Sequence, residues 1–250
     1  MTNRFERPPD AIARLVHLLH VRSLDADLHR FELASDGALA CAKALGPELA
    51  TAAVTWVLER YEPGRDHRVP ERAADVAARL LLAPAAPTLV GCLERLSEVD
   101  PVAHAAFRAL ESIGAPAVEP LLAAFARCSS IEDRVLLGGA LAQLPSGDAR
   151  VCAALETVLP EAPESGAGLL GAYGDRRALP ALAATLERLE PLAAGPGELT
   201  RLEQIVAVGQ AILALRGRMT KVQREKFERA YARSDELIAA GGFEERVVPG

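Results

Sequence analysis

The sequence predicts an all-α protein, a solenoid of stacked antiparallel helix pairs, and three observations lead to this prediction. A short apolar helix, a Gly/Pro turn and a second apolar helix recur at a spacing of about thirty residues, which is typical of stacked helical arrays. Alanine and leucine, which favour helix, dominate the apolar residues, and the alternating pattern of strands is scarce. Apolar residues make up 50% of the chain and charged residues 25%, which is enough apolar material for a continuous core.

The repeating unit is clearest in the turns and the second helices that follow them, where apolar residues fall three or four apart and form one stripe. These segments are residues 46–60, 83–96, 114–127, 147–159 and 174–189. The first helices of the pairs are predicted over residues 38–45, 73–82, 103–113, 134–144 and 166–173. The stripes predict that the following side chains are buried between layers: Leu58, Leu89, Leu93, Leu121, Phe125, Leu155, Leu159, Leu182 and Leu186. Trp56 points away from this stripe and is expected to be partly exposed or covered by the N-terminal helix.

The flanks of the repeats depart from the pattern. Residues 1–9 are expected to be disordered, residues 9–21 to form an amphipathic helix, and residues 23–35 to form a connector that can hold a further helical turn. Two longer helices are predicted over residues 199–215 and 220–240, with Thr220 as N-cap and a glycine pair at 241–242 as the stop. We therefore expect an N-terminal arm and capping helix (1–35), a repeat array (36–190), capping helices (191–240) and a flexible tail (241–250).

The run Gly-Asp-Arg-Arg-Ala-Leu-Pro-Ala-Leu at residues 174–182 carries a family resemblance. Together with the turns described above, it resembles HEAT repeats, and more narrowly the short HEAT-like repeats of the phycobilisome-lyase type. The resemblance covers about residues 36–189 and implies an α-solenoid whose second helices line the concave side. Its functional implication is broad, because the family includes scaffolds, adaptors, chaperone-like subunits and a few lyases.

Composition and charge reduce the number of possible functions and locations. The net charge of −6 argues against a general nucleic-acid binder. There is no uninterrupted apolar run of about eighteen residues and no apolar signal core at the N-terminus, so we expect no membrane span and a cytoplasmic location. The four cysteines are predicted to be reduced and largely buried, at Cys41, Cys92, Cys128 and Cys152.

The sequence lacks the common catalytic motifs. The sequence contains no dinucleotide-binding glycine motif, P-loop, nucleophile-elbow motif or His-Glu-x-x-His motif. His17 and His20 face one way and could hold a metal with His29, but no fixed carboxylate or thiolate stands beside them. We therefore predict no catalytic residue, no metal and no cofactor.

Two candidate binding surfaces follow from the charge pattern. Glu-Arg pairs recur at equivalent repeat positions and predict a partner-binding charge ladder of Glu59, Arg60, Glu94, Arg95, Glu187 and Arg188. The HEAT-like resemblance, in which second helices line the concave side, implies that Arg127 and Arg150 belong to the same surface. The segment from Arg216 to Arg233 holds seven basic residues against two acidic ones, a net +5. It predicts a second surface of Lys221, Arg224, Lys226, Phe227, Arg229 and Tyr231, unless it is only a solvated capping helix.

Two functional hypotheses from different classes are consistent with these observations. The first is a non-enzymatic scaffold or adaptor that binds a protein partner along the concave face, with homo-oligomer formation through the C-terminal helices left open. The second is a lyase-like enzyme that handles a chromophore or another ligand, as the resemblance allows. Such an enzyme needs a pocket of polar residues that departs from the repeat pattern.

Overall fold

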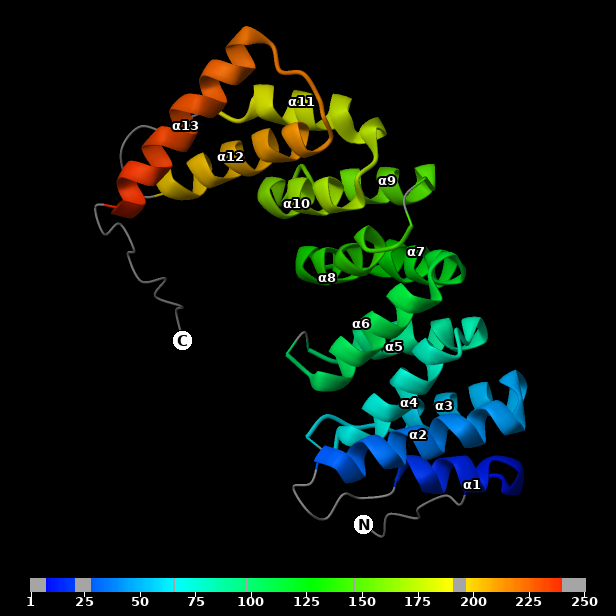
Figure 1. Ribbon diagram of the computed structural model, residues 1–250. Helices are drawn as coiled ribbons and strands as arrows, with labels where there is room; N and C mark the ends of the chain where they lie inside the picture. The colour runs from blue at the N-terminus through cyan, green and yellow to red at the C-terminus, as the bar shows by residue number, and fades with distance from the viewer. Residues whose placement is uncertain are drawn as a thin grey trace. The chain divides into compact units, whose positions relative to one another are not determined.

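The computed structural model describes residues 8–20, 28–64, 66–97, 99–145, 147–190 and 197–239, and in these residues the chain forms thirteen α-helices and no strand (Figure 1). The prediction of an all-α protein is confirmed. The helices are α1 (Asp10–Leu19), α2 (Leu28–Leu45), α3 (Pro47–Glu59), α4 (Arg68–Arg79), α5 (Ala86–Arg95), α6 (Pro101–Ile113), α7 (Val118–Arg127), α8 (Ile131–Ala142), α9 (Ala149–Glu156), α10 (Pro163–Tyr173), α11 (Leu179–Arg188), α12 (Glu198–Ala214) and α13 (Lys221–Ala239). Short 3-10 helices precede three of them: η1 (Ala83–Ala85), η2 (Ala115–Ala117) and η3 (Arg176–Ala178).

The chain divides into two compact units, Met1–Cys128 and Ser129–Gly250. In unit 1, the first helices α2, α4 and α6 pack on one another, and α1, α3, α5 and α7 pack in succession as a second layer (Figure 1). In unit 2, α8, α10 and α12 pack in succession, α9 contacts η3, and α11 and α13 both pack on α12. In both units, helices that alternate along the chain are therefore neighbours in space.

Several turns between consecutive helices are stabilised by capping hydrogen bonds. Asp100, Asp148 and Asp175 each accept a hydrogen bond from the backbone N–H two residues ahead, at 2.8–2.9 Å, and so cap the helix that follows. Gly174 ends α10 in the left-handed conformation (φ 78°), which favours glycine. The predicted cap at Thr220 is confirmed, because its hydroxyl accepts from Gln223 N (3.2 Å) while Gln223 Oε1 accepts from Thr220 N (2.8 Å).

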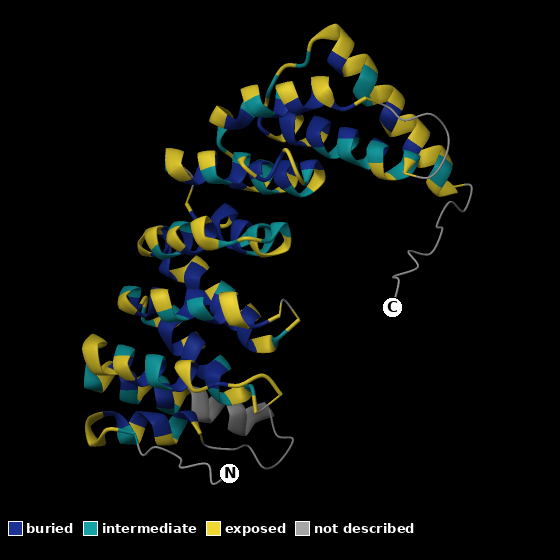
Figure 2. Ribbon diagram, turned by 180° about the vertical axis from the view of Figure 1, so that it is seen from behind, coloured by how far each residue is buried: buried dark blue, intermediate teal, exposed yellow. Residues whose placement is uncertain are grey.

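The core is a layer of leucine and alanine between the helices (Figure 2). All nine side chains predicted to lie between layers are buried. The amphipathic helix α1 also buries the four residues of its predicted stripe, which are Ile12, Leu15, Val16 and Leu19. Alanines such as Ala50, Ala53 and Ala106 are completely buried, and their small size allows the backbones of neighbouring helices to approach closely.

Some boundaries differ from the sequence prediction. Helix α2 begins at Leu28, inside the segment predicted as a connector, because its first residues are good helix formers with no proline among them. Helix α4 covers Arg68–Arg79, so it begins and ends earlier than the helix predicted over residues 73–82. The predictions for residues 1–7, 21–27 and 240–250, including the glycine stop and the flexible tail, lie outside the described residues.

The C-terminal end of α4 places a leucine where glycine is preferred. Leu81 N donates to Ala78 O and Leu82 N donates to Ala77 O, which is the hydrogen-bond pattern of a Schellman turn. This turn requires a positive φ at Leu81 (51°), where a Cβ atom crowds the backbone. The Leu81 side chain is also 61% exposed, so its burial contributes little that could offset the strain of the positive φ.

We therefore expect Leu81→Gly to raise the free energy of unfolding by about 1 kcal/mol. The matched control is Leu213→Gly, because Leu213 is similarly exposed (52%) but lies within the helical segment α12. That change should lower the free energy of unfolding by about 1 kcal/mol. Urea denaturation followed by circular dichroism measures both, and effects of the same sign would contradict this interpretation.

Two glycines of α10 provide a second matched pair. A Cβ atom on Gly166 would lie 2.9 Å from Leu159 N and 3.1 Å from Leu159 Cα, so backbone atoms block it. A Cβ atom on Gly168 would meet nothing within 4 Å.

Gly166→Ala should therefore lower the free energy of unfolding by about 1–3 kcal/mol, because the backbone of residue 159 must move. Gly168→Ala should raise it by about 0.5–1 kcal/mol, because alanine favours helix. Parallel urea denaturation of the two single variants measures the difference. If Gly166→Ala is as stable as the wild type, α10 does not approach residue 159 as closely as the structure indicates.

Candidate functional site

The charge ladder of unit 1 lies at the C-terminal ends of the second helices. Glu59 and Arg60 end α3, Glu94 and Arg95 end α5, and Arg127 ends α7. All five residues are exposed. Because α3, α5 and α7 pack in succession, the repeated sequence position becomes a row of charges along one edge of unit 1. We call this row the unit 1 ladder.

Contacts between neighbouring repeats hold the unit 1 ladder in place. Arg95 Nη2 donates to Leu58 O at the end of α3 (3.2 Å), while Arg95 Nε donates to Gly91 O within α5 (3.0 Å). Arg127 Nη2 forms a 2.7 Å ion pair with Glu94 Oε1. The ladder charges therefore connect α3 to α5 and α5 to α7, a role that the sequence pattern alone did not reveal.

An aromatic side chain lies beside the ladder. The Arg60 guanidinium stacks over the Trp56 indole, 4.5 Å from the ring centroid, and Arg60 Nη1 donates to Trp56 O (3.4 Å). Trp56 is partly exposed, which confirms the expectation from its position beside the buried stripe. The spacing of four residues between Trp56 and Arg60 was the sequence signal for this stacking.

The remaining predicted ladder residues belong to unit 2. Glu187 and Arg188 are exposed at the end of α11, and Glu187 Oε1 accepts a hydrogen bond from Gln223 Nε2 (3.0 Å). Arg150 does not occupy the equivalent position. It lies in the first turn of α9, at the opposite end of the helix from the ladder position, because the helix begins directly after its cap Asp148.

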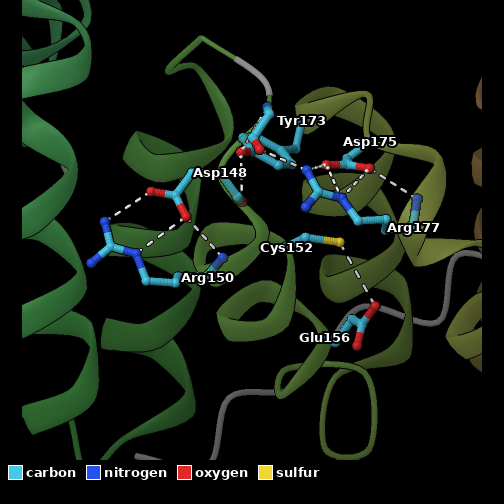
Figure 3. A network of polar contacts seen from close by, with 8 residues as sticks. Asp148, Arg150, Cys152, Glu156, Tyr173, Asp175 and Arg177 are labelled. Atoms are coloured by element: carbon cyan, nitrogen blue, oxygen red, sulfur yellow. Dashed lines mark hydrogen bonds and ion pairs between the residues drawn. The ribbon is translucent and has the colours of Figure 1, made fainter.

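Arg150 instead belongs to a polar network in the turns of unit 2 (Figure 3). Two turns of the pattern Gly-Asp-x-Arg each pair the capping aspartate with the arginine, at 2.9 Å for Asp148–Arg150 and 2.7 Å for Asp175–Arg177. Arg177 Nη2 also donates to Gly147 O of the preceding turn (2.7 Å). The Tyr173 hydroxyl donates to Asp148 O (3.0 Å) and accepts from Gly147 N (3.2 Å).

The electrostatics of this network are those of a structural connection between repeats. Hydrogen bonds from Arg150 and Arg177 lower the pKa values of Asp148 and Asp175, so both carboxylates are held in their charged form. Burial raises the pKa of the Tyr173 hydroxyl. These shifts favour the protonation states that form the hydrogen bonds seen in Figure 3.

Two cysteines and one tyrosine have pKa values raised above their usual range. Burial and the nearby Glu156 raise the pKa of Cys152 to about 11, and its thiol lies 3.7 Å from Glu156 Oε1. Burial also raises the pKa of Cys92. Burial and a hydrogen bond to Asp100 raise the pKa of Tyr61 to about 12. At neutral pH these three groups are therefore in their neutral form.

The cysteine prediction is only partly confirmed. The four thiols are free, and Cys92 and Cys152 are buried as expected. Cys41 and Cys128 are half-exposed. Cys128 follows the last residue of α7, where the helix stops covering it, and its Sγ donates to Ala124 O (3.5 Å).

The predicted second surface on α13 is substantially corrected. Lys226 is directed into unit 2, where its Nζ donates to the carbonyls of Leu186, Glu187 and Leu189 at 3.0–3.2 Å. The Phe227 ring packs on Gly209 of α12, so a Cβ atom there would lie 2.2 Å from the ring. Both side chains are therefore used in packing α13 against the unit.

The rest of α13 is close to neutral in charge. Its nineteen residues contain five basic and four acidic side chains, because Asp235 and Glu236 follow the basic segment in the sequence. Lys221, Arg224, Arg229 and Tyr231 are exposed. Arg233 pairs with Glu198 of α12 at 2.9 Å. The helix as a whole therefore has little net charge, and the unbalanced positive charge is concentrated in its first turn.

No group of three or more histidine, cysteine or acidic side chains in the described residues could hold a metal ion. His17 and His20 are exposed on α1, and His29 lies in a segment whose side chains are outside the description. Across the part of the chain that is described, no helix is long and apolar enough to cross a membrane. The chain matches no known protein-family model and no curated protein.

Proposed function

We propose that this protein is a non-enzymatic protein–protein interaction module built of HEAT-like repeats, and that a partner protein binds along the unit 1 ladder. The turn-anchored helix pairs and the successive packing of equivalent helices support the HEAT-like assignment. In HEAT-like arrays the second helices line the concave side, which is where the ladder helices α3, α5 and α7 would lie.

The observation that carries the proposal is the fixed geometry of the ladder. Arg95 is held by two backbone carbonyls and Arg127 by Glu94, so these guanidinium groups need little further ordering when a partner binds. Pre-organised charges reduce the entropic cost of association, and a fixed order of positive and negative groups discriminates between partners. The partly exposed Trp56 adds an aromatic contact of the kind that is enriched at interfaces.

The test is a comparison of three tagged proteins used to capture partners from the native cell lysate. The ladder variant combines Glu59→Lys with Arg127→Glu and keeps the Arg95 contacts with α3. The matched control combines Glu111→Lys with Arg108→Glu, which makes the same charge changes at exposed positions of α6 in the other layer. Circular dichroism confirms that all three are folded.

We expect one protein to be captured by the wild type and the α6 control and to be reduced about tenfold with the ladder variant. The fluorescence of Trp56, the single tryptophan of the chain, should then report binding of the purified partner to the wild type. Equal capture by all three proteins would show that the ladder is not the binding surface. Turnover of a small molecule by the pure protein would support the lyase-like alternative and refute the interaction module.

A further inference from the structure

The connection between α12 and α13 concentrates positive charge that the rest of the chain does not have. Residues 213–224 contain Arg216, Arg218, Lys221 and Arg224 and no acidic residue, a net +4. The whole chain carries −6, so the remaining residues carry −10. We call residues 213–224 the basic strip.

Three of the four cations of the basic strip have no ionic partner within the described residues. Arg216, Arg218 and Arg224 are exposed, and none of them forms a hydrogen bond through its guanidinium or an ion pair there. Lys221 has a 3.9 Å pair with Glu225, in which both side chains are mostly exposed. The acids on α11 and just after it are already engaged, because Glu187 accepts from Gln223 and Glu190 pairs with Lys226 at 3.4 Å.

The backbone that carries these cations is held firmly. Gly217 N donates to Ile212 O (2.8 Å), and a Cβ atom on Gly217 would lie 2.5 Å from the Leu179 side chain of α11. The reciprocal hydrogen bonds of Thr220 and Gln223 fix the entry into α13. In Figure 1 this orange segment links the end of α12 to the start of α13. The backbone of the basic strip is therefore held in place by these contacts, and the four cations extend from a fixed backbone.

Aliphatic side chains accompany the cations at both ends of the strip. Leu213 precedes the connection and is 52% exposed, and Val222 follows it and is 69% exposed. Arginine is enriched at protein interfaces, and the two aliphatic side chains offer apolar contact on either side of the arginines.

We propose that the basic strip docks a short acidic segment of a partner protein, with carboxylates on the arginines and aliphatic side chains on Leu213 and Val222. The charge distribution favours a short segment over a polyanion. At physiological ionic strength charges are screened beyond about 8 Å, so a short acidic peptide meets the four cations of the strip and only the acids beside them, Glu187 and Glu225. An anionic membrane or a nucleic acid extends over more of unit 2, whose residues outside the strip carry a net −7. The strip lies in unit 2, so this inference is independent of the unit 1 ladder.

The test measures binding of a fluorescently labelled, short synthetic peptide of glutamate and leucine to the full chain by polarisation. The strip variant combines Arg216→Gln, Arg218→Gln and Arg224→Gln. The control variant combines Arg14→Gln, Lys43→Gln and Arg108→Gln, which removes the same charge from exposed positions of unit 1. Vesicles of phosphatidylserine and phosphatidylcholine and a single-stranded oligonucleotide are the competing probes.

We expect the wild type and the control variant to bind the peptide alike, and the strip variant to bind about tenfold or more weakly. Added salt should weaken the wild-type binding. Three results would overturn the proposal: no peptide binding by the wild type, equal binding by the strip variant, or tighter binding of the vesicles or the oligonucleotide than of the peptide. The ladder variant should bind the peptide normally, so failure here leaves the proposed function of the ladder untouched.

Discussion

Leu182→Ala is expected to lower the free energy of unfolding by about 2–5 kcal/mol. Leu182 lies on α11 and is completely buried, and its neighbours Thr185 and Leu186 on the same helix are also buried. Removing its isobutyl group loses the transfer energy of the buried carbons and leaves a cavity, because the surrounding helices are fixed by their own packing.

The matched control is Leu213→Ala, which makes the same change at a leucine of unit 2 that is 52% exposed. It should alter the free energy of unfolding by no more than about 0.5 kcal/mol. Urea denaturation followed by circular dichroism measures both variants. A loss below about 1 kcal/mol at Leu182 would mean that the register of the repeats is wrong.

Lys226→Met is expected to lower the free energy of unfolding by about 2–4 kcal/mol. Its ammonium group binds three carbonyls at the C-terminal end of α11, where the helix backbone leaves its last acceptors unsatisfied. Its positive charge also interacts favourably with the partial negative charge at the C-terminal end of α11. Methionine keeps most of the apolar part of the lysine side chain. The decrease in the free energy of unfolding therefore measures the contribution of the hydrogen bonds and of the charge.

Lys221→Met on the same helix is the control, because Lys221 is 89% exposed and its pair with Glu225 is long. It should change the free energy of unfolding by less than about 0.5 kcal/mol. Both variants should be measured at low and at high salt. Salt should reduce the effect of the exposed Lys221 pair on the free energy of unfolding more than the effect of the partly buried Lys226 contacts. Equal effects of the two substitutions would show that Lys226 does not stabilise the end of α11.

The sequence indicated where charges recur but not how they pair. Glu94 and Arg95 were visible as a repeated pair, yet the partners of these side chains are Arg127 and Leu58 O in neighbouring repeats. Such contacts depend on the distance between helices, which side-chain periodicity does not give. Lys226 and Arg224 likewise look equivalent in a basic segment, and only the rotation of α13 on α12 directs one inward and leaves the other exposed.

The sequence by itself determined the all-α class, the position of the helix pairs and the buried stripe, because each follows from local spacing of apolar residues, turns and caps. The nine predicted core residues and the cap at Thr220 are examples. Only the tertiary structure decided which charged residues are free to meet a partner. A charge is neutralised by whatever lies within a few ångströms of it, and those neighbours, such as Glu190 for Lys226, are distant in sequence.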